Sequence, residues 1–446
     1  MKVGEFQQVT VDCINLEGES VSQLANVGAD CAAPAQAIEV HCPGLFPGEQ
    51  ASVRIEAISR HHPRAFARLK TVQVAHPERR PAACPNHPAN GGKCSGCALM
   101  ELSEPAQREA KRAMLSTLYG LEVSELEPSS LSLGYRLSSK RVALHVKSKV
   151  VLGSFARGSH APAPMPGCLV DHPRLSQVFT VVERECQFQR IAAYDERTGQ
   201  GDLRYVWAKT NGEQVIVTLV VAHAESRAAE LLPAVLNVSD GVLVSVQSGN
   251  ANSLRGGPAT LLRGHSEVSV DLLGQSVEVG ALGFMQPNPE VAERAYWALV
   301  SPVDQGPRSL AFDLYAGAGI TTRALAQHYS QVVACEAYPE SAAQLGIEAS
   351  SVEDFLAREL ASSSPRVPDL LVANPPRKGL GERVTSALSR LRAPELRIMS
   401  CGPEGLARDL AQLTSPEGGY MLAELRAFDT LPQTPHVELV AVLKRR

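Results

Sequence analysis

Cys401 and Glu438 are the two residues whose types and positions best suit covalent catalysis. Cys401 stands between an expected strand at residues 396–400 and an expected helix at residues 403–413. A helix N-terminus favours the thiolate form of a cysteine, and the thiolate is the competent nucleophile. Taken alone, Cys401 has a second interpretation as a buried core residue, which is the commoner fate of a lone cysteine.

Glu438 opens the apolar strand that we expect at residues 437–443. A carboxylate that enters an apolar strand is costly unless it is functional, paired or exposed at an edge. Taken alone, such a carboxylate is more often structural than catalytic.

A glycine-rich turn forms a candidate cofactor site between the strand expected at residues 310–315 and the helix expected at residues 321–328. Its glycines let the backbone approach a ligand closely, and the acid that ends the next strand suits ribose hydroxyls. This pattern favours a nucleoside-containing cofactor. A dinucleotide is disfavoured, because Arg323 stands near the place of the third glycine of the dinucleotide fingerprint. The residues expected at the cofactor are Tyr315, Gly317, Gly319 and Glu336.

Asn374 follows another expected strand, at residues 370–373, and is itself followed by two prolines and Arg377. Two prolines directly after a strand cannot continue a ladder, so they form a stiff ledge that holds Asn374 at the mouth of the sheet. A rigid loop without chemistry explains the pattern equally well.

Three of the ten cysteines cluster, which in a reducing compartment indicates metal binding or catalysis rather than disulfides. They are Cys84, Cys94 and Cys97, and Cys168 lies downstream as a fourth candidate ligand. Four thiolates suit tetrahedral zinc or a [4Fe–4S] cluster. His87 competes as a ligand, and spacing alone does not choose between zinc and iron.

The elements that must position these residues fall into three expected domains. Residues 1–75 alternate in short β-like runs broken by Gly and Pro, which indicates a small OB-like β-barrel. Residues 76–283 hold the cysteine cluster and then strands with a helix or two, as in an α+β domain. Residues 284–446 alternate strands and helices, which predicts a doubly wound, Rossmann-like α/β sheet. Because such sheets bind ligands outside the carboxyl ends of their strands, we expect one cleft to gather the glycine-rich turn, Asn374 and Cys401.

Composition indicates a folded chain, with 446 residues of which 44% are hydrophobic and 20% charged. Because the sequence has no apolar run of about 18 residues and no apolar N-terminal signal, we expect a cytoplasmic protein without a membrane partner. We also expect a monomer. The net charge of −4 conceals a basic region, residues 54–160, with 17 Lys and Arg against eight Asp and Glu. This region suits phosphate binding, although a solvated charged face explains the count equally well.

Together and in this order, these motifs resemble the RNA uracil-5-methyltransferase family. They are more similar to its ribosomal-RNA branch, which has an N-terminal TRAM β-barrel and a [4Fe–4S] cluster. The likeness runs over nearly the whole chain: residues 43–49 resemble the end of a TRAM domain, and the four cysteines match the cluster ligands. Residues 133–136 resemble the start of the central RNA-binding region, and residues 284–288 the cofactor-binding F-x-Q-x-N element, with its glutamine at Gln286. The glycine-rich turn, the Cys401 segment and the Glu438 segment match the cofactor loop, the nucleophile and the base.

The resemblance implies S-adenosylmethionine as cofactor, bound by Gln286, the glycine-rich turn, Glu336 and Asn374. It implies that the Cys401 thiolate adds to carbon 6 of a uracil and that Glu438 removes the proton from carbon 5. The expected substrate is a uridine of 23S ribosomal RNA. The alternatives are a uridine of transfer RNA, or a non-catalytic RNA-binding protein with a degenerate cofactor site.

The chain departs from the family pattern at several positions. The first gap in the cysteine cluster spans nine residues and is longer than usual. Asn374 replaces a usual Asp, which keeps the hydrogen bonding and loses the charge, and Ile320 replaces a usual Asn. Gly402 and Gly405 replace a usual Asn and Thr after the nucleophile. The stretch 341–352 is short, so the helix and loop that flank the adenine in the family are expected to be largely missing.

Overall fold

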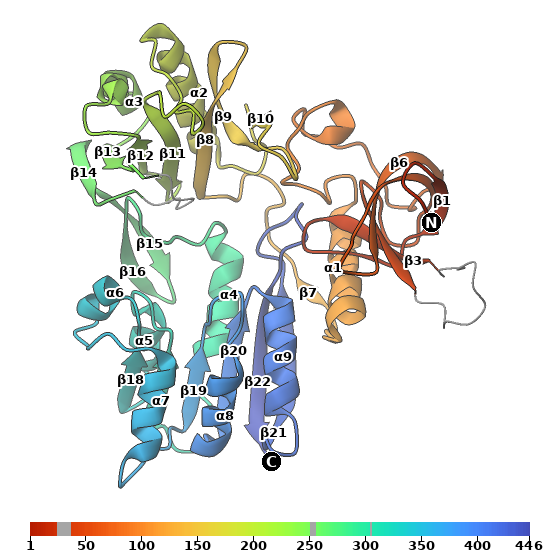
Figure 1. The fold of residues 1–446 in the computed structure, drawn as a ribbon. Helices are drawn as coiled ribbons and strands as arrows, with labels where there is room; N and C mark the ends of the chain where they lie inside the picture. Colours follow the sequence, from red (N-terminus) through yellow and green to blue (C-terminus); the bar gives the residue numbers. More distant parts are fainter. Residues whose placement is uncertain (25–36, 250–255, 304–305) are drawn as a thin grey trace. The chain divides into compact units, whose positions relative to one another are not determined.

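The computed structural model describes residues 1–24, 37–249, 256–303 and 306–446, which divide into two compact units (Figure 1). Three stretches of the chain form unit 1, and they are Met1–Arg79, Leu102–Ser130 and Glu290–Arg446. The other two stretches form unit 2, and they are Arg80–Glu101 and Leu131–Pro289. None of the described helices is long and apolar enough to cross a membrane.

Unit 1 begins with a six-stranded sheet whose strand order is β1-β5-β6-β4-β3-β2. Its strands are β1 (Phe6–Thr10), β2 (Cys13–Ile14), β3 (Glu19–Leu24), β4 (Ile38–Pro43), β5 (Gln50–Ile58) and β6 (Arg64–Val74). Alternate residues such as Ala51, Val53 and Ile55 on β5 face a shared apolar core, while their neighbours face outward. This sheet fits the β-barrel that the sequence predicts for the N-terminus.

The rest of unit 1 contains a seven-stranded sheet with the order β18-β17-β19-β20-β22-β21-β7. The strands are β7 (Leu126–Glu127), β17 (Leu310–Leu314), β18 (Gln331–Cys335), β19 (Leu370–Ala373), β20 (Glu395–Ser400), β21 (Tyr420–Phe428) and β22 (Glu438–Arg445). The helices are α1 (Glu104–Tyr119), α4 (Pro289–Val300), α5 (Ile320–Leu325), α6 (Pro339–Gln344), α7 (Val352–Ala361), α8 (Glu382–Leu391) and α9 (Pro403–Leu413). Strands β17 to β20 pair in parallel, and β22 runs antiparallel between β20 and β21. The predicted Rossmann-like sheet is therefore present.

Two features of this sheet differ from, or extend, what the sequence suggests. Residues 102–130, assigned from sequence to the central domain, belong to unit 1, because α1 packs with α9 and β7 pairs with β21. The segment between β18 and β19 is described throughout and holds α6 and α7 but no strand. Within the described residues, β18 therefore forms one edge of the sheet.

Unit 2 is an α+β unit with a mostly antiparallel sheet of order β10-β9-β8-β11-β12-β13-β14, in which only β12 and β13 pair in parallel among the described strands. The strands are β8 (Ser138–Val146), β9 (Lys149–Phe155), β10 (Pro162–Pro164), β11 (Leu203–Thr210), β12 (Val215–Val221), β13 (Gly241–Val246) and β14 (Ala259–Gly264). Helices α2 (Pro173–Phe188) and α3 (Leu232–Leu236) share an apolar core with the sheet, and β15 (Glu267–Leu272) and β16 (Gln275–Gly280) form a separate hairpin.

Candidate active site and cysteine-lined pocket

Cys401 and Glu438 lie side by side because of the register between two antiparallel strands. Ser400, the last residue of β20, stands opposite Leu439 of β22. In an antiparallel pair, the residue after Ser400 then faces the residue before Leu439. Cys401 is partly exposed, whereas Glu438 is only 9% exposed.

Arg377 interacts with both Cys401 and Glu438. Its side chain makes a hydrogen bond to Cys401, and its positive charge acts on both Cys401 and Glu438. Burial raises the pKa of Glu438 to about 8, and the charge of Arg377 only partly opposes this. Burial and then the Glu438 charge raise the pKa of Cys401, while Arg377 lowers it. The guanidinium is thus the group that favours the thiolate, as an opposite charge at hydrogen-bonding distance does.

Two glycines after the nucleophile let the Arg377 backbone lie directly against the start of α9. A Cβ on Gly402 would stand 2.1 Å from the carbonyl oxygen of Arg377, and one on Gly405 would stand 2.8 Å from it. Asp409 of α9 then accepts hydrogen bonds from the backbone N–H groups of Leu380 (2.7 Å) and Gly381 (3.1 Å). The glycines that replace the usual Asn and Thr therefore belong to a close contact between the Arg377 loop and α9.

The role of Arg377 escaped the sequence-based prediction, although the residue stands in the segment Asn374-Pro-Pro-Arg377. The feature of the sequence that could have indicated this role is a cationic residue placed just after a rigid strand end. We expect Arg377→Gln to raise the pKa of the Cys401 thiol, because an opposite charge beside it is lost. The pH dependence of Cys401 alkylation by iodoacetamide, followed by peptide mass spectrometry, measures this.

Arg383→Gln is the matched control for that experiment, because Arg383 is exposed on α8 and has no interaction with Cys401 among the described contacts. An alkylation profile that is the same in Arg377→Gln and in the unmodified protein would show that Arg377 does not stabilise the thiolate.

The glycine-rich turn lies at the carboxyl end of β17 and contacts the acid that ends β18. Tyr315, Gly317 and Gly319 have φ of 61°, 54° and 80°, a left-handed backbone that favours glycine. The Glu336 carboxylate accepts hydrogen bonds from Gly317 N at 2.8 Å and from Tyr338 N at 2.7 Å. Each carboxylate oxygen keeps a further lone pair, so the anchored acid remains able to accept from ribose hydroxyls.

The short segment after Glu336 packs directly onto this turn. A Cβ on Gly319 would stand 2.2 Å from Cδ2 of Leu345, the residue that follows α6. Beneath the turn, the buried Asp313 accepts hydrogen bonds from the Thr321 and Thr322 hydroxyls at 2.7 and 2.6 Å. Burial raises the pKa of Asp313 to about 6 despite these two bonds.

The remaining predicted cofactor residues divide between the units. The backbone N–H of Asn374 reaches Leu314 O at 3.4 Å, so Asn374 stands beside the glycine-rich turn, as the sheet topology requires. The carboxyl ends of β17, β18, β19 and β20 thus carry the turn, Glu336, Asn374 and Cys401 along one edge of one sheet. Gln286 belongs to unit 2.

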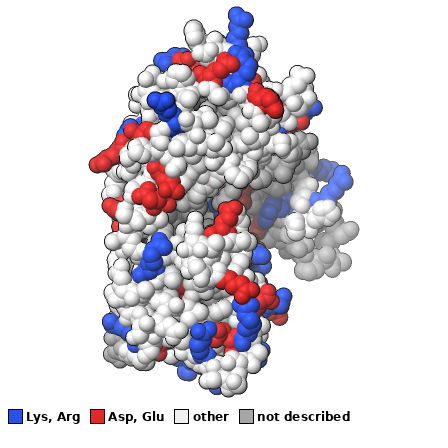
Figure 2. All heavy atoms as spheres, turned by 90° about the vertical axis from the view of Figure 1, so that its left-hand side faces the viewer, with Lys and Arg blue, Asp and Glu red and all other residues white. Residues whose placement is uncertain are grey.

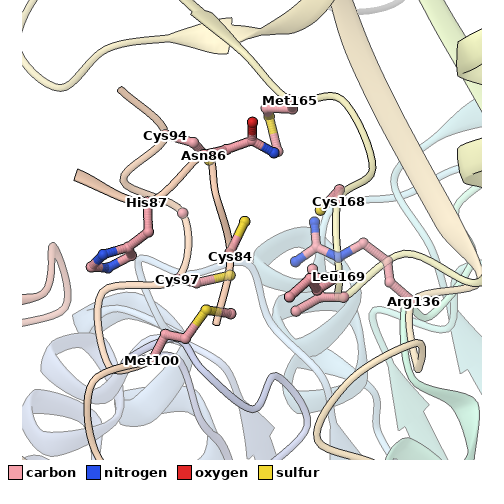
Figure 3. A pocket seen from close by; sticks show the side chains of 12 residues that line it. Cys84, Asn86, His87, Cys94, Cys97, Met100, Arg136, Met165, Cys168 and Leu169 are labelled. Atoms are coloured by element: carbon pink, nitrogen blue, oxygen red, sulfur yellow. The ribbon is translucent and has the colours of Figure 1, made fainter. Parts of the chain in front are cut away.

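A pocket of unit 2 is lined by all four cysteines that the sequence singles out (Figure 3). The other side chains drawn there include Met100, Met165, Leu169 and Arg136. The pKa of Cys97 is raised to about 12 by burial and by the neighbouring sulfurs of Cys168 and Cys94. The ring of His87 caps the short helix η1 (Pro88–Asn90) by accepting from Ala89 N, and it points away from the sulfurs (Figure 3).

The long gap between the first two cysteines has a defined conformation. Asn90 Nδ2 donates to the carbonyls of Ala82 and Cys84 at 2.7 and 2.9 Å. Asn86 Nδ2 donates to Pro166 O at 2.7 Å, which ties this loop to the loop that carries Cys168. The insertion therefore joins the two stretches of chain that supply the cysteines.

Among the described residues, no three His, Cys, Asp or Glu side chains are arranged around a single metal-ion position. A structural zinc ion requires four ligands converging on one point. In a [4Fe–4S] cluster each cysteine binds a different iron, so the sulfurs surround a larger body. The described residues therefore do not confirm the [4Fe–4S] cluster that the sequence leads us to expect.

Comparison with known proteins shows that this chain is similar to proteins named RNA methyltransferases. No protein-family model matches it. An uncharacterised RNA methyltransferase of Synechocystis is 28% identical, over 99% of this chain and 96% of that protein. One of Listeria innocua is 28% identical, over 91% of this chain and 93% of that protein.

Among solved structures, the tRNA (uracil-54, C5)-methyltransferase of Pyrococcus abyssi, in complex with S-adenosyl-L-homocysteine, superposes with a TM-score of 0.73. It is 21% identical and covers 98% of this chain and 100% of its own. The chain therefore has the multidomain fold of that protein, including its Rossmann-like methyltransferase sheet.

Proposed function

We propose that this enzyme transfers a methyl group from S-adenosylmethionine to carbon 5 of a uridine in RNA. The observation that carries the proposal is the position of Cys401 beside the buried Glu438, one residue beyond the Ser400–Leu439 pair of β20 and β22. A nucleophile beside a carboxyl group of raised pKa is the pair that this reaction needs. The likeness to proteins named RNA methyltransferases supports the RNA substrate.

Carbon 5 of uracil is a poor nucleophile, and the residues of this chain overcome that in two steps. The Cys401 thiolate, favoured by Arg377, adds to carbon 6 and pushes electron density onto carbon 5. The cofactor supplies an electrophilic methyl group. Glu438 then accepts the proton from carbon 5, the double bond reforms, and the bond to Cys401 breaks. The target base must leave its stack to reach both groups.

The cofactor is proposed to bind at the edge described above. The glycine-rich turn would approach it closely, Glu336 would accept from its ribose hydroxyls, and Asn374 would line the same edge. Gln286 is proposed as a further contact on the resemblance of residues 284–288 alone.

For the RNA, the N-terminal sheet offers a basic and aromatic surface. The β5–β6 hairpin carries Arg54, Arg68 and Lys70, and Phe66 on it is 41% exposed. Basic grooves with exposed aromatic rings suit single-stranded nucleic acid. On the face drawn in Figure 2, by contrast, Lys and Arg are interspersed with Asp and Glu.

We propose 23S ribosomal RNA as the substrate, because the four cysteines that line the pocket match, in the sequence resemblance, the cluster ligands of the ribosomal-RNA branch. The Pyrococcus abyssi protein acts on tRNA, so tRNA is the second candidate. Methyl transfer from labelled S-adenosylmethionine to ribosomal and transfer RNA lacking 5-methyluridine, with nuclease mapping, tests both. Label in 5-methyluridine of one RNA supports the reaction and identifies the substrate, whereas no label in either contradicts the proposal.

We also propose that Cys84, Cys94, Cys97 and Cys168 hold a [4Fe–4S] cluster. Anaerobic purification is then expected to give about four iron and four sulfide per chain, and Cys168→Ser to lower both. Iron and acid-labile sulfide assays measure this. Cys401→Ala is the matched control, because it removes a cysteine outside the pocket. Zinc without sulfide would refute the cluster.

A further inference from the structure

The loop between β21 and β22 lies inside the protein although it has no regular secondary structure. Its residues Asp429, Thr430, Gln433, Thr434 and Val437 are each less than 9% exposed. A buried irregular loop carries backbone polar groups that need partners within the protein. In this loop, several of those partners come from α1, more than 300 residues away in sequence.

Lys111 of α1 is fully buried and directs its ammonium group into the loop. Its Nζ donates to Asp429 Oδ1 at 2.5 Å, to Leu431 O at 3.2 Å and to His436 O at 3.0 Å. An ammonium group has three donors, so all of them serve this loop. The bonds reach the first residue after β21 and a residue two positions before Glu438.

Gln107, one helical turn earlier on α1, binds the middle of the same loop. Its Nε2 donates to Gln433 Oε1 at 2.8 Å, and its Oε1 accepts from Gln433 N at 2.9 Å. Gln433 has φ of 70°, which a non-glycine residue adopts rarely. The helix thus holds a loop conformation that the chain alone disfavours.

We propose that Lys111 and Gln107 are positioning residues that hold Glu438 against Cys401. The inference rests on the proposed function. Glu438 is the first residue of β22 and pairs with Phe428, the last residue of β21. Because Lys111 binds just beyond both of these strand ends, it limits how far the start of β22 moves relative to Cys401.

The alternative is that the Lys111–Asp429 pair only stabilises the fold. Lys111→Met alone does not separate the two roles, because it leaves a buried carboxylate without its partner. The double variant Lys111→Met, Asp429→Leu removes both charges and keeps apolar bulk, an exchange that folds generally tolerate. It also removes the donors to Leu431 O and His436 O, so it tests positioning directly.

The first measurement is the pH profile of Cys401 alkylation, which requires neither RNA nor cofactor. The negative charge of Glu438 raises the pKa of Cys401. If Glu438 moves away in the double variant, the alkylation profile shifts to lower pH, as it does in Glu438→Gln. This readout decides the proposal even if the unmodified protein transfers no methyl group, an outcome that contradicts the proposed function alone.

The second measurement is turnover of the RNA that the unmodified protein methylates. We expect release of the covalent adduct to slow by roughly 10- to 100-fold in the double variant, because a small misplacement of a catalytic group has effects of that size. Adduct formation should change less, since Cys401 and Arg377 remain. Adduct should therefore accumulate on denaturing gels.

Arg112→Met is the matched control, because Arg112 lies on α1, is exposed and pairs with Glu109 rather than with the loop. Gln107→Met is a second variant that leaves the ion pair intact and decides the question if the double variant does not fold. An alkylation profile and an adduct level like those of the unmodified protein, in a folded variant, would overturn the proposal.

Discussion

Replacing Cys401 with alanine is expected to lower methyl transfer by roughly 10⁴-fold or more, because a missing nucleophile removes the whole covalent path. RNA binding should remain, since the basic and aromatic surface of the β5–β6 hairpin is untouched. Single-turnover methyl transfer and filter binding measure the two quantities separately.

The covalent adduct provides a second test of Cys401 as the nucleophile. RNA that carries 5-fluorouridine at the target has no proton at carbon 5 to lose, so the unmodified enzyme should remain attached to it. Cys401→Ala should form no such adduct, while Cys186→Ala, a change in the buried core of unit 2, should form it normally. An adduct in Cys401→Ala would assign the nucleophile to another residue.

The sequence predicted the elements and the strand-end positions of the site residues well, because these depend on local patterns. Apolar runs followed by Gly or Pro predict where strands end, and ligand sites follow at those ends. What the pattern did not predict is the register of β22 on β20, which decides that Cys401 meets Glu438. Register depends on pairing between distant segments, and a slip of one residue would turn Glu438 to the other face of the sheet.

Most of the interactions that the sequence did not predict involve charged or small residues in unusual environments. Lys111 lies in an amphipathic helix, and the sequence alone predicts a surface residue there because lysines are rarely buried. In the structure its side chain is fully buried. In the sequence, Gly402 and Gly405 are only departures from the family pattern. In the structure they lie against the Arg377 backbone, where a Cβ atom would collide with it. The sequence shows that the stretch 341–352 is short, but the packing of Leu345 on Gly319 depends on tertiary structure.

Replacing Glu438 with glutamine is expected to slow product release by about 10²- to 10⁴-fold, the usual contribution of a general base. The amide keeps the shape and hydrogen bonding of the side chain but accepts no proton. Cys401 still adds to carbon 6, so adduct with ordinary uridine RNA should accumulate in this variant and not in the unmodified enzyme. Quantifying the adduct on denaturing gels, beside the exposed-site control Glu424→Gln, measures this.

The pH dependence follows from the same carboxyl group. Because the pKa of Glu438 is raised to about 8, the group holds its proton at neutral pH, and its basic form grows as the pH rises. The rate of adduct breakdown should therefore increase up to tenfold per pH unit below about 8 and level off above it, provided that proton removal limits it. In Glu438→Gln this dependence should vanish, whereas Arg377→Gln should move it to higher pH, since the charge that opposes protonation is lost. Where proton removal limits the rate, a rate that is level from pH 6 to 9 in the unmodified enzyme would contradict a Glu438 carboxyl group of raised pKa as the base.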